Sequence, residues 1–159
     1  GGMFEKRHEG QSYIRSAGHL GWAFPAALGA KCGAPNRPVV CFMGDLGFWY
    51  HMAEVETAVR AGINTITIIN NNNSGNMGKD RISNIFDGKP TTASQDIWVQ
   101  NKINFAKIAE DMGAVGIRIE KANEIASAFQ NALQLDKPVV IDIATDIEVV
   151  APKAWEPKA

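Results

Sequence analysis

Apolar residues follow two spacings along the chain, and the two alternate. Runs rich in β-branched residues predict strands that are covered on both faces. These runs span residues 39–43, 63–69, 115–119 and 139–144. Between them, apolar residues recur every three or four positions, which predicts helices. These helices span residues 22–31, 105–112 and 125–133, with a further one that starts at Phe48 and ends at Gly62.

This order of strands and helices predicts an α/β fold in three layers, a mainly parallel sheet with helices on both faces. Ligands of such sheets bind beyond the carboxyl ends of the strands. From Asn76 to about Asn101 there is no clear period, and a segment of that length is typically functional or mobile. We therefore expect a leading segment at 1–17, one domain at 18–150 and a tail at 151–159.

Composition narrows the class of protein. The chain has 159 residues, of which 45% are hydrophobic and 21% charged, as in an ordinary globular domain. Its 16 basic and 17 acidic residues form no basic block, so neither nucleic acid nor a membrane surface is an expected partner. Cys32 and Cys41 form no CxxC motif, and we expect two buried thiols in a reducing cytoplasm.

Polar residues follow two consecutive predicted strands. Asp45 comes after the first, and Asn70 to Asn73 come after the second, followed by a Ser74-Gly75 turn. Carboxylate, amide and main-chain oxygens suit Mg²⁺, whose shell is usually completed by phosphates and water. Gly44 and Gly47 allow a backbone to approach a ligand closely, and the helix after them offers free N–H groups to an anion. The pattern predicts a metal–diphosphate site.

The spacing of these motifs resembles a known signature. Gly44-Asp45-Leu46, then 24 residues, then Asn71-Asn72 is similar to the Gly-Asp-Gly and Asn-Asn motifs of the thiamine-diphosphate enzymes. Residues 18–30, 104–109 and 137–142 also resemble stretches of that family. The resemblance covers about residues 13–152. It is closest to the diphosphate-binding, C-terminal domain of the acetolactate synthase and benzoylformate decarboxylase group.

The resemblance implies a set of site residues. Magnesium would be held by the side chains of Asp45 and Asn72 and by the carbonyl of Ser74. The diphosphate of thiamine diphosphate would be held by backbone amides, those of Gly44, Leu46, Gly47, Gly75 and Asn76.

The same resemblance assigns the other end of the cofactor. Gly18 and Leu20 would bond the aminopyrimidine edge through their backbones, and the Leu20 side chain would hold the cofactor in a V shape. His19 lies between two motif glycines, and we expect it at the cofactor, facing the substrate. Met77 would line the cofactor and substrate pocket if the segment after Asn76 closes over it; the alternative is a surface loop. The cofactor carries the carbanion chemistry on a 2-oxo acid, and the protein orients it.

Two features depart from the family pattern. Leu46 stands where the family has a glycine. If the position needs a positive φ, leucine would be strained there and metal affinity or diphosphate fit would be altered; if it needs only the backbone amide, leucine serves. The family's activating glutamate comes from a pyrimidine-binding domain, and no such domain is expected in this chain. Glu54 and Glu56 follow the metal motif on a helix, and Glu56 can pair with Arg60. We therefore expect no catalytic residue in this chain, and a homodimer or tetramer that completes the site.

The sequence predicts the diphosphate-binding domain of a thiamine-diphosphate- and Mg²⁺-dependent lyase or transferase, an acetolactate synthase-like decarboxylase or carboligase. Gly1-Gly2 before Met3 fits the cut edge of a larger enzyme. One alternative is a separately encoded subunit of a two-chain 2-oxo acid decarboxylase. The other is a non-catalytic, flavodoxin-like module, which would need a phosphate loop where Asp45 stands.

Overall fold

Four parallel strands form the centre of the computed structural model, which describes residues 6–15, 18–75, 79–89 and 91–149. Along the chain they are β1 (Val40–Gly44), β2 (Ile66–Asn71), β3 (Val115–Ile119) and β4 (Val139–Ala144). Their order across the sheet is β1-β2-β4-β3, and all three pairings are parallel. The carboxyl ends therefore meet at one edge, where the predicted ligand residues lie.

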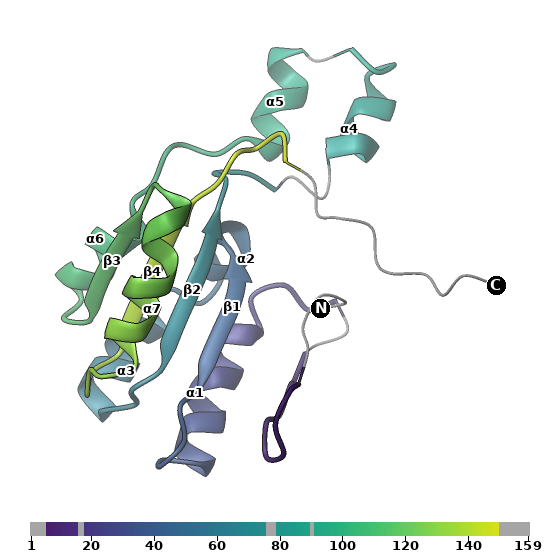
Figure 1. The fold of residues 1–159 in the computed structure, drawn as a ribbon. Coiled ribbons are helices and arrows are strands. Elements are labelled where there is room, and N and C mark those ends of the chain that lie inside the picture. The colour runs from purple at the N-terminus through teal and green to yellow at the C-terminus, as the bar shows by residue number, and fades with distance from the viewer. Residues whose placement is uncertain (1–5, 16–17, 76–78, 90, 150–159) are drawn as a thin grey trace.

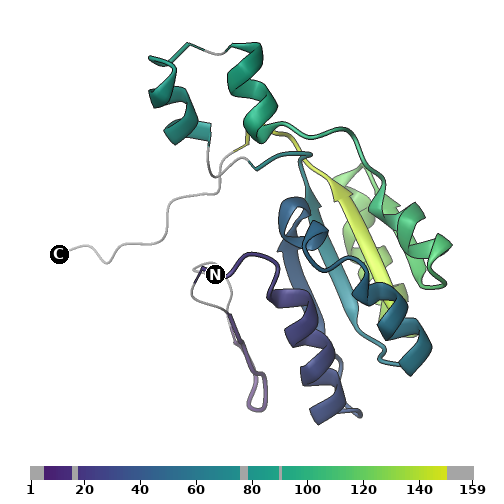
Figure 2. The ribbon, with the colours of Figure 1, turned by 180° about the vertical axis from the view of Figure 1, so that it is seen from behind.

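Helices cover both faces of this sheet, as Figures 1 and 2 show from opposite sides. One face carries α1 (Ala23–Gly33), α2 (Asp45–Trp49), α3 (Glu54–Ala61) and α6 (Phe105–Asp111), and its core centres on Phe24, Phe48 and Phe105. The other face carries α7 (Ile125–Ala132), preceded by a 3-10 turn at Ala122–Glu124. The predicted three-layer α/β class is confirmed.

Close packing of α6 on β3 requires a glycine at position 116. A Cβ on Gly116 in β3 would lie 2.1 Å from the backbone oxygen of Ala106 in α6. No side chain fits at that distance, so α6 lies directly on the strand. The helix thereby seals the core next to Val140 and Ala109, both buried.

The helix predicted from Phe48 is wrong in its bounds. A short helix, α2, starts at Asp45 and ends at Trp49, and a turn over residues 50–53 separates it from α3. In this turn the N–H of His51 bonds the oxygen of Phe48 at 3.2 Å, a tighter i→i+3 pattern. Phe48 and Val55 on either side of the turn are both buried, which is why the apolar spacing continues across it.

The second predicted strand is shifted by several residues. β2 begins at Ile66 and includes Asn70 and Asn71, which pair with Gly44 of β1 and Ala144 of β4. Asparagine has low strand propensity, but hydrogen bonds to a neighbour on each side override it here.

The expectation that residues 76–101 lack regular structure is wrong. They contain α4 (Lys79–Ile85) and α5 (Thr92–Trp98), which lie together beyond the carboxyl edge of the sheet (Figure 1). A capping box starts α5: Thr91 Oγ1 accepts from the Ser94 N–H at 3.1 Å, and Ser94 Oγ accepts from the Thr91 N–H at 2.8 Å.

The two cysteines differ in exposure. Cys41 is buried, and burial raises the pKa of its thiol to about 12. The expectation of burial is wrong for Cys32, which is exposed. The buried residues of α1 are Phe24, Ala27 and Leu28, all in the first turns of the helix, and Cys32 lies in its last turn. Within the described part of the chain, no helix is long and apolar enough to span a membrane.

Candidate metal and diphosphate site

The three predicted metal ligands lie together at the carboxyl ends of β1 and β2. Gly44 pairs with Asn70 in the sheet, so Asp45 and the residues after β2 leave it side by side. The Ser74 N–H donates to Asp45 Oδ2 at 3.0 Å. Asn72 Oδ1 accepts from the Ser74 N–H at 3.2 Å and from its hydroxyl at 3.0 Å. One carboxylate and one amide oxygen therefore meet at Ser74.

Asp45 is a buried carboxylate held only by backbone donors. Its side chain is 3% exposed, and its other oxygen accepts from the Leu46 N–H at 2.8 Å. Burial raises the pKa of Asp45, and the backbone hydrogen bonds from Leu46, Ser74 and Asn73 counteract part of that rise. None of the cationic side chains in the described ranges forms an ion pair with it.

A divalent cation fits this donor set. A buried carboxylate without a cation is costly, and each Asp45 oxygen uses only part of its acceptor capacity on backbone donors. Among the described residues, no group of three or more His, Cys, Asp or Glu could hold a metal. With the neutral oxygens of Asn72 and Ser74, Asp45 would form the mixed oxygen set that Mg²⁺ accepts, which stays a prediction.

The backbone at the start of α2 accommodates leucine at the motif position. Leu46 lies inside a helix, and the only described non-glycine residues with positive φ are Asn73 and Asp87. Leucine is therefore unstrained at the motif position. Gly44 before it is extended, with φ −83° and ψ 163°. The backbone of Gly44, Leu46 and Gly47 thus passes along the edge of the sheet, and its binding of a diphosphate stays a prediction.

Leu20 lies against the same short helix. A Cβ on Gly47 would lie 3.5 Å from Leu20 Cδ1, and the Leu20 side chain is 49% exposed. The next residue, Gly21, has φ +88°, and a Cβ there would meet Tyr50 Cβ at 2.6 Å, so only glycine fits. This close passage brings Leu20 next to the metal motif, and Gly18 and His19 are exposed on the same segment.

The predicted residues after Ser74 are described only in part. The Gly75 N–H donates to the oxygen of Trp98 at 2.7 Å, and a Cβ on Gly75 would lie 3.1 Å from Leu46 Cδ2. Gly75 is therefore packed between Leu46 and the end of α5. Asn76 and Met77 lie outside the described residues.

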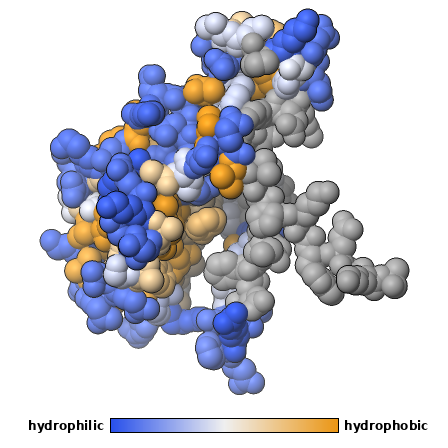
Figure 3. Space-filling model, turned by 45° about the horizontal axis from the view of Figure 1, so that its top comes forward, coloured by the Kyte–Doolittle hydropathy of each residue, from blue (hydrophilic) through white to orange (hydrophobic). Residues whose placement is uncertain are grey.

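Sequence reasoning missed a cavity beside the metal residues. It has a volume of about 500 Å³ and opens widely to the surface. Its lining comes from α2 and from the segment after α5, and consists of Leu46, Trp49, Val99, Gln100, Asn101 and Ile103. Viewed with this end of the molecule tilted forward, the surface shows separate hydrophobic patches among polar side chains (Figure 3). Trp49 and Val99 are exposed at 39% and 42%.

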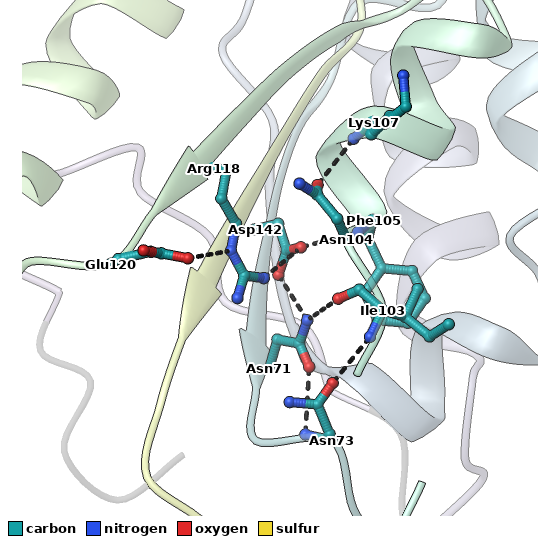
Figure 4. A network of polar contacts seen from close by, with 9 residues as sticks. All are labelled: Asn71, Asn73, Ile103, Asn104, Phe105, Lys107, Arg118, Glu120 and Asp142. Atoms are coloured by element: carbon teal, nitrogen blue, oxygen red, sulfur yellow. Dashed lines mark hydrogen bonds and ion pairs between the residues drawn. The ribbon is translucent and has the colours of Figure 1, made fainter. Parts of the chain in front are cut away.

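A buried polar network behind the metal residues was also missed (Figure 4). Asn71 and Asp142 are both fully buried, and Asn71 Nδ2 donates to Asp142 Oδ1 at 2.9 Å. Asp142 Oδ2 accepts from Arg118 at 2.7 Å and from the Phe105 N–H at 2.8 Å. One signal was available: an aspartate inside the apolar run of residues 139–144 must find partners when both faces of the strand are covered.

Comparisons with known proteins identify relatives of this chain. The model of the family described as "Thiamine pyrophosphate enzyme, C-terminal TPP binding domain" matches residues 2–143. The acetolactate synthase large subunit of Haemophilus influenzae is 36% identical over 151 residues, which cover 91% of this chain and 26% of that protein. The acetolactate synthase of Bacillus subtilis is 32% identical over 127 residues, covering 80% of this chain and 21% of that protein.

A solved structure is similar in fold. The thiamine diphosphate-dependent 4-hydroxybenzoylformate decarboxylase of Rhodococcus jostii RHA1 matches with a TM-score of 0.70 and 29% identity. The match covers 80% of this chain and 23% of that chain. The chain therefore spans about a quarter of the length of the relatives it matches.

Proposed function

Because this chain belongs to the family of C-terminal, cofactor-binding domains of the thiamine pyrophosphate enzymes, we propose that it holds the diphosphate end of thiamine diphosphate together with Mg²⁺. The observation that carries this proposal is the hydrogen bond between the Ser74 N–H and the Asp45 carboxylate. It brings the Asp45 carboxylate to the Ser74 N–H, from which the Asn72 amide oxygen also accepts.

The proposed site divides into metal ligands, diphosphate-binding amides and one apolar support for the cofactor. Asp45 and Asn72 offer side-chain oxygens to the metal, and Ser74 offers its carbonyl. We assign the diphosphate to the backbone amides of Gly44, Leu46 and Gly47 at the same edge; the Leu46 N–H, which donates to Asp45 Oδ1, would have to be shared with it. Leu20, next to Gly47, would support the cofactor from that side. When bound, thiamine diphosphate supplies carbanion stabilisation beside the carbonyl of a 2-oxo acid.

The proposed site needs a second domain. Glu56 is exposed and pairs with Arg60 at 3.0 Å on α3, which supports an ion-pair role for Glu56 on a solvated face. The activating glutamate would come from a pyrimidine-binding domain of the same or another chain, in a cytoplasmic homodimer or tetramer. The exposed hydrophobic side chains of Leu20, Trp49 and Val99 near the metal residues suit such a contact.

For the complete protein we propose an acetolactate synthase-like activity, decarboxylation of a 2-oxo acid or its ligation to a second carbonyl compound. Sequence similarity to acetolactate synthases over most of the chain supports it. A separately encoded subunit of a two-chain decarboxylase is the second candidate, and the length of the natural reading frame decides between the two. The match to the thiamine pyrophosphate enzyme family argues against a flavodoxin-like module.

The experiment that tests this function uses the complete protein with thiamine diphosphate and Mg²⁺. Aliphatic and aromatic 2-oxo acids are supplied in turn, and carbon dioxide release and the organic products are measured by NMR. We expect one class to be consumed only when both cofactor and metal are present. An aldehyde product indicates a decarboxylase, and a 2-hydroxy ketone product indicates a carboligase. A folded, cofactor-saturated protein that consumes none of these acids contradicts the proposal.

A further inference from the structure

We propose that Asn71 is a positioning residue for the metal ligands: it ties the turn that carries Asn72 and Ser74 to the buried carboxylate of Asp142. The inference rests on the proposed function, because it concerns the same metal. Its premise is the buried network of Figure 4, which runs from Arg118 on β3 through Asp142 on β4 to Asn71 on β2.

The Asn71 amide is satisfied at both ends. Its Nδ2 donates to Asp142 Oδ1 at 2.9 Å and to the backbone oxygen of Ile103 at 2.9 Å. Its Oδ1 accepts from the Asn73 N–H at 3.2 Å. Two acceptors at one end and a donor at the other fix the orientation of the amide. The amide therefore links the sheet to the turn, and neither aspartate nor leucine can make all three bonds.

Asp142 gives this link its strength. Its side chain is fully buried, and its charge is compensated by Arg118, by Asn71 and by the Phe105 N–H. Hydrogen bonds to a charged group are stronger than neutral ones. The Arg118 side chain is 25% exposed and also lies 3.6 Å from Glu120, so the cation reaches from the surface to the buried end of the network.

The turn is held from both sides. Asn73 adopts a left-handed backbone with φ 54°, and its Oδ1 accepts from the Ile103 N–H at 3.1 Å. The oxygen of Asn73 accepts from the Gln100 N–H at 2.8 Å. Asn71 bonds the amide of Asn73 as well as the oxygen of Ile103, so it holds the turn and the segment behind it at once. Ser74 follows directly, which is how its N–H comes to face Asp45.

The substitution Asn71→Asp tests the link in the complete protein. It keeps the shape and the acceptor for Asn73, but it places a carboxylate against Asp142 and the oxygen of Ile103. Outer partners of metal ligands typically change metal affinity 10- to 100-fold, and we expect a loss of about that size in Mg²⁺ affinity, measured by calorimetry at saturating thiamine diphosphate. Hydrogen exchange at the amides of Asn73 and Ser74 should also become faster.

The double substitution Asn71→Asp with Asp142→Asn restores an amide–carboxylate pair with reversed polarity. We expect it to recover part of the lost Mg²⁺ affinity, because the repulsion is removed while the bond to the Ile103 oxygen stays lost. Arg118→Met is the second variant: it removes the cation beside Asp142 and leaves the Asn71 amide in place, and its fold is checked by urea unfolding. It should weaken Mg²⁺ binding several-fold. Ile119→Val is the matched control: it loosens the buried core without touching the network, and its Mg²⁺ affinity should equal that of the wild type.

The outcomes separate this inference from the proposed function. A wild-type protein that binds no Mg²⁺ and no cofactor contradicts the function, while hydrogen exchange still reports whether Asn71 holds the turn. A wild type that binds both, with unchanged affinity in Asn71→Asp and Arg118→Met, overturns the positioning role. If Asn71→Asp does not fold, the Arg118→Met result decides alone. If Ile119→Val loses as much affinity as the network variants, the positioning role is also overturned.

Discussion

The N–H of Ser74 donates to Oδ2 of Asp45 at 3.0 Å, although 29 positions separate the two residues. The bond joins the residue after β1 to the turn that follows β2, because Gly44 and Asn70 pair at the ends of these strands. Two strand ends that leave the sheet in parallel thus share one carboxylate. A metal bound there would be in contact with both.

The stability of the metal-free protein should depend on pH through Asp45. Burial raises the pKa of Asp45 above its ordinary value of 3.8, so the folded state holds this proton more tightly than the unfolded chain does. The corresponding stability is fully present below pH 3.8 and is lost as pH rises through the raised pKa. In EDTA, the wild type should lose stability relative to Asp45→Asn as pH rises through that window. The quantity compared is the difference between their free energies of unfolding. Urea unfolding at stepped pH measures it.

Magnesium should reverse this trend. The metal binds the ionised carboxylate, so the stabilisation by Mg²⁺ and thiamine diphosphate should grow as pH rises through the raised pKa of Asp45. Asp45→Asn should show neither the loss without metal nor the gain with it. If Asp45→Asn keeps both the pH-dependent loss without metal and the gain with metal, the group that ionises is not Asp45.

Leu46→Gly restores the residue of the family pattern and should be destabilising. Leu46 is helical, and glycine in a helix costs about 1 kcal/mol relative to a good helix former. The substitution also removes the contact between Leu46 and Gly75. We expect a loss of at least about 1 kcal/mol in free energy of unfolding, with cofactor affinity within a few-fold of wild type because the amide is kept. A large gain in affinity would mean that the leucine obstructs the diphosphate.

Gly116→Ala should destabilise the fold strongly. The added methyl group would meet the backbone of Ala106 at 2.1 Å, and neither β3 nor α6 can retreat without opening the core. Overpacking of this kind costs about 3 kcal/mol. Gly29→Ala is the control, because a Cβ there meets nothing within 4 Å and alanine favours the helix by about 1 kcal/mol. Chemical unfolding of the two variants should shift in opposite directions.

Thr67→Val should be neutral or stabilising. The Thr67 hydroxyl is buried and has no hydrogen-bond partner among the described residues, and valine keeps its shape. Removing an unpaired buried polar group gains about 1 kcal/mol. Thr67→Ala is the comparison: alanine lacks both methyl groups of valine at this buried site, so it should be less stable than Thr67→Val by about 2 kcal/mol. If Thr67→Val is clearly less stable than the wild type, the hydroxyl has a partner in solution.

Some of this architecture could be read from short stretches of sequence. Parallel strands end at one edge, so Asp45 and Asn72 could be placed together once two consecutive strands were recognised. The capping box of Thr91 and Ser94 is equally local, and it could have revealed α5 within the segment taken as structureless. These features depend on neighbours within a few residues or on a general rule of sheet topology.

Other features depend on pairs that the sequence does not bring together. Asn71 and Asp142 are 71 positions apart, and their contact follows only from the strand order that inserts β4 between β2 and β3. The turn that interrupts the helix after Trp49 has a similar cause. It lets both Phe48 and Val55 reach the core, and tertiary packing overrides the helical spacing.

Calorimetric titration of the complete protein with thiamine diphosphate tests the central claim most directly. With Mg²⁺ present, we predict saturable binding by the wild type, no binding after addition of EDTA, and loss of the Mg²⁺-dependent binding in Asp45→Ala. The Thr67→Val variant, altered on the same sheet away from the ligands, should bind like the wild type. A folded wild type that binds no cofactor, or an Asp45→Ala variant that binds as tightly as the wild type, would contradict the account.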